Sequence, residues 1–180
     1  MKKSGCILIF LLSFHFGAWA ATGQAKPLEY GKLASQLMHN FSRRMAVEKG
    51  LKPLTSGGGM MEEIYSLSVG YTTCGNVNVE EARALLVSCV EDFADTINKN
   101  RQLRPYLHDY PFPPKSIELS IIFEKPNHDY VDAEYVARVS LLDGAVHYSY
   151  YDHEKNGYDH SRSSKEPYEE ALRLVKEKGN

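Results

Sequence analysis

The chain has 180 residues, and its 21 Lys and Arg against 23 Asp and Glu give a formal net charge of −2. This mildly acidic balance argues against a general nucleic-acid binder, which usually carries a marked basic excess. Beyond the N-terminal segment no apolar run approaches the roughly 18 residues that a membrane span requires. We therefore expect no nucleic-acid partner and no stable membrane insertion.

The N-terminal segment has the features of an export signal. Basic residues precede an apolar run over 7–16, and Ala20 ends a small-x-small motif of the kind cleaved by signal peptidase. We expect a signal peptide at 1–20 and a single globular domain at 21–180. The mature protein is then periplasmic or secreted.

Two amphipathic helices and one strand are predicted next. Apolar residues recur every three or four positions over 27–49, which is typical of a helix with one buried face. Residues 55–59 are interpreted as a flexible glycine-rich link, and alternation over 65–72 predicts a half-buried strand. The clearest helix begins after Asn78, which has the spacing of a capping box with Glu81.

Three strands follow, and a hairpin sets their register. Alternating apolar residues over 117–123 and 135–141 predict two of them. The Asp143-Gly144 dipeptide predicts a two-residue hairpin turn into the third. Pairing outward from this turn brings the apolar side chains of both hairpin strands onto one face, which supports the register.

The chain ends with a predicted loop and helix. Residues 151–164 are polar and are interpreted as a loop, and a last helix is predicted near 165–178. The predicted order is α-β-α-β-β-β-α. This order indicates an α+β domain of two layers, with a mainly antiparallel four-stranded sheet covered by helices on one face.

Cys74 and Cys89 remain after signal cleavage, in a compartment where disulfides persist. Cys89 falls on the apolar face of the second helix, about 15 Å from its start. Cys74 must therefore fold back along the helix before the Cα atoms come within the roughly 7 Å that a bond requires. Two alternatives stay open: a disulfide, or two buried thiols that behave as small hydrophobes.

One face of the predicted sheet is polar. Because Val146 and Tyr148 face the core in this register, their neighbours along the strand face away from it. A two-layer fold leaves that side open to a ligand or a partner protein, whereas the alternative is a solvated face with cross-strand salt bridges. The candidate binding residues on this face are Glu118, Arg138, His147, Ser149 and Tyr151.

A second candidate site is the polar loop. Asp152, His153, Asp159 and His160 form two Asp-His pairs, and these side chains are ligands that zinc and copper accept. The loop could close around a single transition-metal ion. Neither Cys-x-x-Cys nor His-Glu-x-x-His spacing supports this reading, and the alternative is a hydrated loop.

The sequence contains no Gly-x-Ser-x-Gly motif and no element that would supply an oxyanion hole. We therefore expect an exported, non-catalytic binding domain without a cofactor. It would bind a protein or a small molecule through the polar sheet face or the Tyr- and His-rich C-terminal loop. The alternatives are a metal-binding protein or metal-dependent hydrolase centred on residues 152–160, and a self-associating component of the cell envelope.

Overall fold

This computed structural model describes residues 26–179, which contain three α-helices and six strands. The expected signal peptide at 1–20 lies outside the described residues. No helix within 26–179 is both long enough and apolar enough to cross a lipid bilayer. The elements are α1 (Lys26–Lys49), β1 (Lys52–Gly57), β2 (Leu67–Cys74), α2 (Val79–Lys99), β3 (Ile117–Glu124), β4 (Arg138–Leu142), β5 (Ala145–Asp152), β6 (Gly157–Pro167) and α3 (Tyr168–Lys178), with 3₁₀ turns at Arg104–Tyr106 and Pro114–Ser116.

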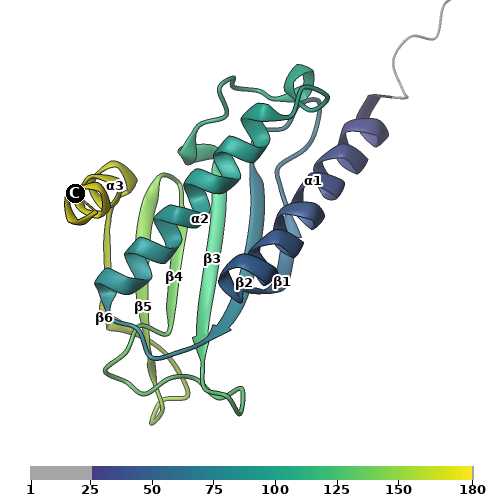
Figure 1. Cartoon of the computed structure of the whole chain (residues 1–180). Helices are drawn as coiled ribbons and strands as arrows, with labels where there is room; N and C mark the ends of the chain where they lie inside the picture. The colour runs from purple at the N-terminus through teal and green to yellow at the C-terminus, as the bar shows by residue number, and fades with distance from the viewer. Residues whose placement is uncertain (1–25, 180) are drawn as a thin grey trace, which may run out of the picture.

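All six strands form one sheet in the order β1-β2-β3-β4-β5-β6. Every neighbouring pair is antiparallel except β2 and β3, which are parallel and are joined by α2 as a crossover. Figure 1 shows α1 and α2 lying across one face of the sheet, with α3 beside α2 at the β6 end. No described helix covers the other face. The predicted α+β class and the mainly antiparallel sheet are confirmed.

The sheet has six strands, so the predicted four-stranded sheet is wrong. The additional strands, β1 and β6, are the two edges, and most of their side chains are exposed. They replace the predicted link at 55–59 and most of the predicted loop at 151–164. An edge strand that is exposed on both faces buries few side chains, so its sequence need not alternate apolar and polar residues. Neither β1 nor β6 therefore has a period-two pattern.

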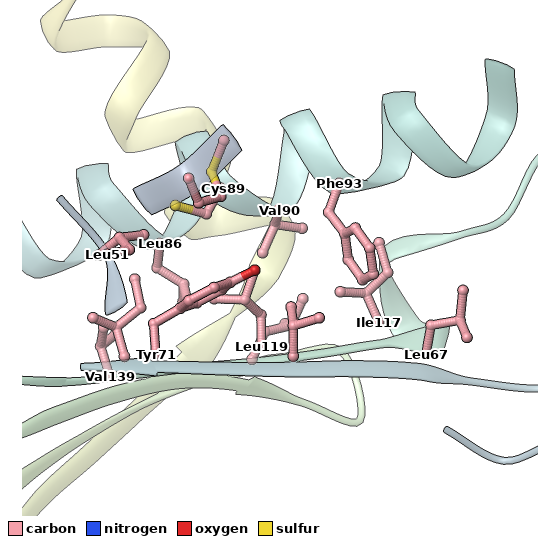
Figure 2. Packing of buried hydrophobic residues seen from close by; sticks show 14 of the residues in the cluster. Leu51, Leu67, Tyr71, Leu86, Cys89, Val90, Phe93, Ile117, Leu119 and Val139 are labelled. Carbon is pink, nitrogen blue, oxygen red and sulfur yellow. The ribbon is translucent and has the colours of Figure 1, made fainter. Parts of the chain in front are cut away.

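Helix α2 is the element that the sequence specifies most clearly. The Asn78 side chain accepts a hydrogen bond from the Glu81 backbone at 3.0 Å, and the Glu81 carboxylate accepts one from the Asn78 backbone at 2.9 Å. The predicted capping box is therefore confirmed. Figure 2 shows Leu86, Val90 and Phe93 projecting from this helix onto the sheet, where all three are fully buried. Burying each such side chain contributes about 1.5–3 kcal/mol.

The β4–β5 hairpin forms with the predicted register. Asp143 and Gly144 have φ values of 49° and 73°, which a two-residue hairpin turn of this twist requires. Val139 pairs with Tyr148, and Ser140 pairs with His147. The hairpin therefore places alternate side chains of both strands on the uncovered face.

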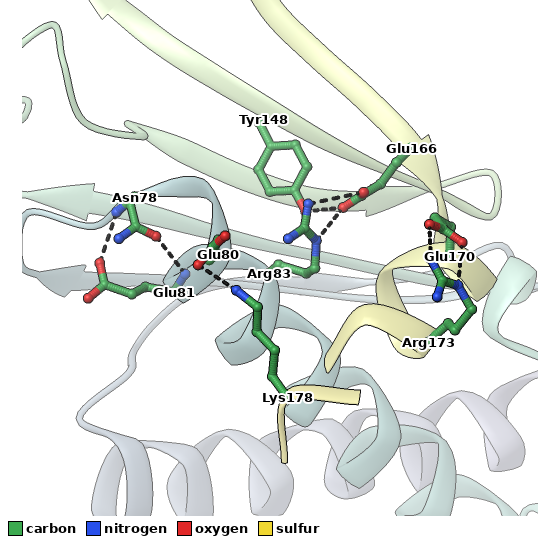
Figure 3. A network of polar contacts seen from close by, with 9 residues as sticks. All are labelled: Asn78, Glu80, Glu81, Arg83, Tyr148, Glu166, Glu170, Arg173 and Lys178. Atoms are coloured by element: carbon green, nitrogen blue, oxygen red, sulfur yellow. Dashed lines mark hydrogen bonds and ion pairs between the residues drawn. The ribbon is translucent and has the colours of Figure 1, made fainter. Parts of the chain in front are cut away.

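A polar network joins β6 and α3 to α2 (Figure 3). Arg83 donates to both carboxylate oxygens of Glu166, at 2.7 and 3.1 Å, and the Tyr148 hydroxyl donates to the same carboxylate. Tyr168, at the start of α3, donates to Glu91 of α2 at 2.7 Å. These contacts hold the C-terminal edge of the sheet against the helical layer.

Candidate functional site

The uncovered face of the sheet contains a hollow of about 250 Å³ where β4, β5 and β6 meet. Serine, tyrosine, histidine and arginine side chains provide its polar lining, and no carboxylate contributes to it. The residues around it are Arg138, Ser140, Leu142, His147, Tyr148, Ser149, Tyr158, His160, Ser163 and Ser164.

An irregular pairing between β5 and β6 shapes this hollow. Tyr148 pairs with Ser164, but Tyr150 pairs with Asp159. Ser149 alone on β5 therefore lies opposite the four residues 160–163 of β6. Such a bulge interrupts the ladder and redirects the side chains of the longer strand, and two of the four, His160 and Ser163, line the hollow.

Arg138 is the only lysine or arginine in the lining. It lies on β4 between Ile122 and Ser149, and its guanidinium carbon is 4.9 Å from the centre of the Tyr158 ring. Its Nε is buried and has no hydrogen-bond partner. Among the side chains described at 29–179, it is the one buried nitrogen or oxygen without a partner. A buried donor without a partner costs free energy, which a bound acceptor would recover.

Three tyrosines support the arginine from the loop end of the sheet. Tyr130 and Tyr151 stack with ring centres 3.8 Å apart, and Tyr158 lies edge-on to both at 6.0 Å. Tyr151 also donates to Asn156 at 2.6 Å, which ties the cluster to the β5–β6 turn. Burial raises the pKa of the Tyr158 phenol, so it stays neutral and presents an aromatic face to Arg138.

The structure brings together three of the five residues predicted for the polar face. Arg138, His147 and Ser149 line the hollow. Glu118 lies on the same face of the sheet but lines an adjoining hollow instead. Tyr151 is only 8% exposed because Tyr130 covers it, so it supports the site and is not available to a ligand.

The four residues considered as metal ligands do not converge. Asp152 accepts hydrogen bonds from the backbone of the turn that follows it, Asp159 accepts from Ser161, and the His153 ring contacts a carbonyl oxygen 2.9 Å away. His160 belongs to the hollow beside Arg138. Within residues 26–179 no group of three or more His, Cys, Asp or Glu side chains could share an ion. The geometry therefore gives the metal alternative no support.

Cys74 and Cys89 are free thiols in the structure, so the disulfide alternative is not realised. Cys74 follows Gly70 and Thr72 on the uncovered side of β2, whereas Cys89 is fully buried beneath α2. The sheet lies between the two side chains. Cys74 is exposed, so the alternative of two buried thiols holds for Cys89 alone.

Several lining residues were missed because β6 was interpreted as a loop. Tyr158, Ser163 and Ser164 reach the hollow only when this segment pairs with β5. The Asn156-Gly157 dipeptide was an available signal, since Asn-Gly favours hairpin turns. Asn156 does have a positive φ of 50° at that turn.

Comparison with known proteins assigns no family to this chain. No family model, no curated protein and no solved structure matches it. The proposals below therefore depend on the geometry of the uncovered face.

Proposed function

We propose that this protein is an exported, non-catalytic binding domain that takes a small anionic ligand in the hollow around Arg138. The observation that carries the proposal is the buried Arg138 Nε, which has no partner among the described residues. No carboxylate lines the hollow to balance the guanidinium charge. A carboxylate or phosphate group would supply both the missing acceptor and the missing charge.

The surroundings favour an anion for a physical reason. Arginine presents a planar fork of donors that matches carboxylate and phosphate oxygens, and such charge-assisted hydrogen bonds are about twice as strong as neutral ones. Ser140 and Ser149 add hydroxyl donors around the same space. The bracing by Tyr158 holds the guanidinium in place before the ligand arrives, which lowers the entropy cost of binding.

The proposal assigns binding, and no catalytic step, to this hollow. A serine nucleophile needs a base within hydrogen-bond reach. Among the hydrogen bonds of the described chain, none joins His147 or His160 to a serine of the lining. Export, which rests on the N-terminal sequence at 1–20, remains part of the proposal and fits a domain that captures a ligand outside the cytoplasm.

The proposal is tested by titrating the purified protein with acetate and, separately, with inorganic phosphate, at low ionic strength. Amide chemical shifts should move in β4, β5 and the bulge of β6. Arg138→Gln keeps most of the side-chain volume but removes the charge, and should weaken binding at least about tenfold. The exposed Arg101→Gln removes the same charge elsewhere and should leave binding unchanged.

The two anions distinguish the sources of the ligand group. A response to acetate indicates a carboxylate, and a response to phosphate alone indicates a phosphorylated molecule. If neither anion moves the amides of these strands, or if Arg138→Gln binds as the parent protein does, the proposed function is wrong.

A further inference from the structure

A second hollow, of about 280 Å³, continues from the first across the uncovered face toward β1. The two share Arg138, Ser140 and Leu142. We call these two adjoining hollows the trough; their linings draw on all six strands, from Thr55 on β1 to Ser164 on β6. The proposed anion occupies only the hollow between β4, β5 and β6, so the second hollow is available to the rest of a longer ligand.

The floor of the trough is low because small residues meet at its centre. Gly70, Ser120 and Ser140 lie side by side on three neighbouring strands. A Cβ atom on Gly70 would come 2.4 Å from the Thr55 hydroxyl and 3.1 Å from the Ser120 hydroxyl. Those two hydroxyl groups therefore occupy the space above the glycine and can hydrogen-bond to a ligand that lies over it.

Opposite charges flank this row of small residues along the strand direction, with Arg138 on one side and Glu118 on the other. Arg138 pairs with Ile122 on β3, and Glu118 lies four residues before Ile122 on the same strand and the same face. At about 3.3 Å per residue the two positions are about 13 Å apart along the strand, which is too far for a direct ion pair. Among the side chains that the structure describes, at 29–179, Glu118 forms no salt bridge.

Other charged groups on this face lie outside the trough or already have partners. Glu124 pairs with His128 at 3.0 Å. Lys52 and Lys165 lie on the edge strands β1 and β6, and neither lines the two hollows. Arg138 and Glu118 are thus the charged pair that a ligand in the trough would meet.

We propose that the trough binds a short extended peptide whose terminal carboxylate contacts Arg138 and whose free amino group contacts Glu118. This inference rests on the proposed anion site. An extended tripeptide is about 10 Å long, and side-chain reach at both ends covers the remaining distance. The Ser120 and Ser140 hydroxyls lie between the two charged groups, with the Thr55 hydroxyl beside them, where they can donate to the peptide carbonyls and accept from its N–H groups.

The test compares trialanine, N-acetyltrialanine and acetate by titration of the purified protein at pH 7 and low ionic strength. Trialanine should bind about fivefold more tightly than its acetylated form, because an exposed ion pair contributes at most about that factor. Glu118→Gln should remove this preference and leave acetate binding unchanged. Glu48→Gln, which removes an exposed carboxylate from α1, should retain the preference.

A steric variant gives a second, independent measurement. Ser120 lines the second hollow but not the first, so Ser120→Leu should block trialanine while acetate still binds. Equal affinity for the free and acetylated peptides, or a preference that survives Glu118→Gln, overturns the peptide inference. The proposed function stands in both cases if acetate binding still depends on Arg138, and it fails with the inference if acetate and phosphate both fail to bind.

Discussion

Cys74 and Cys89 occupy opposite environments at the residue scale. Cys74 is exposed at the end of β2, where its thiol lies 4.0 Å from the Lys125 carbonyl oxygen. Cys89 is fully buried in α2, and burial raises the pKa of its thiol to about 12. Since the thiolate is the reactive form, the two side chains should differ greatly in reactivity.

Iodoacetamide should therefore modify the folded protein selectively. We expect Cys74 to react readily and Cys89 to react at least about 100-fold more slowly, because it reacts only through opening of the structure. Peptide mass mapping would locate the label. In guanidinium chloride both cysteines should react without a reductant.

A map in which both cysteines react only after reduction would show a disulfide and contradict the structure. Cys74→Ser is the matched control and should abolish labelling of the folded domain at this site. The same map, made on protein recovered from its host, also tests the expected cleavage after Ala20, because peptides from 1–20 would be missing.

At the scale of elements, the contact of Arg83 with Glu166 joins α2 to β6, and Tyr148 adds β5 to the same contact. The two side chains are 14% and 17% exposed, and Glu166 raises the pKa of the Arg83 guanidinium. Removing Arg83 leaves the poorly exposed Glu166 carboxylate without its opposite charge, with only the Tyr148 hydroxyl as a partner. β6 and α3 depend on this contact for their position against α2.

Arg83→Ala should lower the free energy of unfolding by about 2–3 kcal/mol, measured by urea denaturation. Arg173 makes two ion pairs as well, with Glu170 at 2.6 Å and Glu177 at 2.5 Å, but all within α3 and in solvent. Arg173→Ala should therefore change stability much less. Equal effects of the two substitutions would show that the Arg83 contact does not hold the layers together.

Elements that bury one face were predictable from sequence, whereas the sheet edges were not. The apolar periodicity of α2 reflects the need to bury one face of a helix, and the Asp143-Gly144 dipeptide reflects the positive φ values of a tight turn. The structure contains both the helix and the turn. β1 and β6 are stabilised by backbone pairing with a neighbour and bury few side chains. Backbone pairing leaves little trace in the order of side chains, since every residue but proline can take part.

The same distinction divides the candidate site. His147 and Arg138 could be placed on a common face because they belong to strands whose opposite face is apolar. His160 could not, since its position depends on the bulge between β5 and β6, and that bulge depends on the pairing of an edge strand. Sequence periodicity therefore predicts the residues that β4 and β5 contribute to the hollow, whereas those of β6 depend on tertiary pairing.

At the scale of the whole molecule, buried tyrosines link folding stability to alkaline pH. Tyr71, Tyr148 and Tyr168 lie on β2, β5 and α3, and each is at most 2% exposed. Burial raises the pKa of Tyr71 from 10.0 to about 12. Burial also raises the pKa values of Tyr148 and Tyr168. The neighbouring carboxylates, Glu166 and Glu91, raise these two pKa values further.

Unfolding should therefore become easier above about pH 10. Between the unfolded pKa of about 10 and the higher folded values, the unfolded chain has lost protons that the folded protein keeps, so the free energy of unfolding falls as pH rises. Below pH 10 this contribution is fully present. Urea denaturation at several pH values, with tyrosinate absorbance at 295 nm, would measure the slope and the accompanying ionisation.

Tyr71→Phe provides the control for this pH dependence. It removes the contact of the hydroxyl with Ser42 at 3.1 Å and should cost about 1 kcal/mol near neutral pH. The loss of stability above pH 10 should be shallower in this variant, since one ionising group is gone. A stability that stays constant to about pH 11.5 would mean that these phenols ionise within the folded protein.

In a sheet that helices cover on one side only, alternate residues along a strand have different roles. Ile121 and Val139 face the helices, where a change of volume disturbs packing, while their strand neighbours Ser120 and Ser140 face outward and carry little of the core. Mutations on the outward positions can therefore accumulate without loss of the fold. Such a scaffold can acquire a new ligand by a few substitutions, and its recognition surface can evolve faster than its architecture.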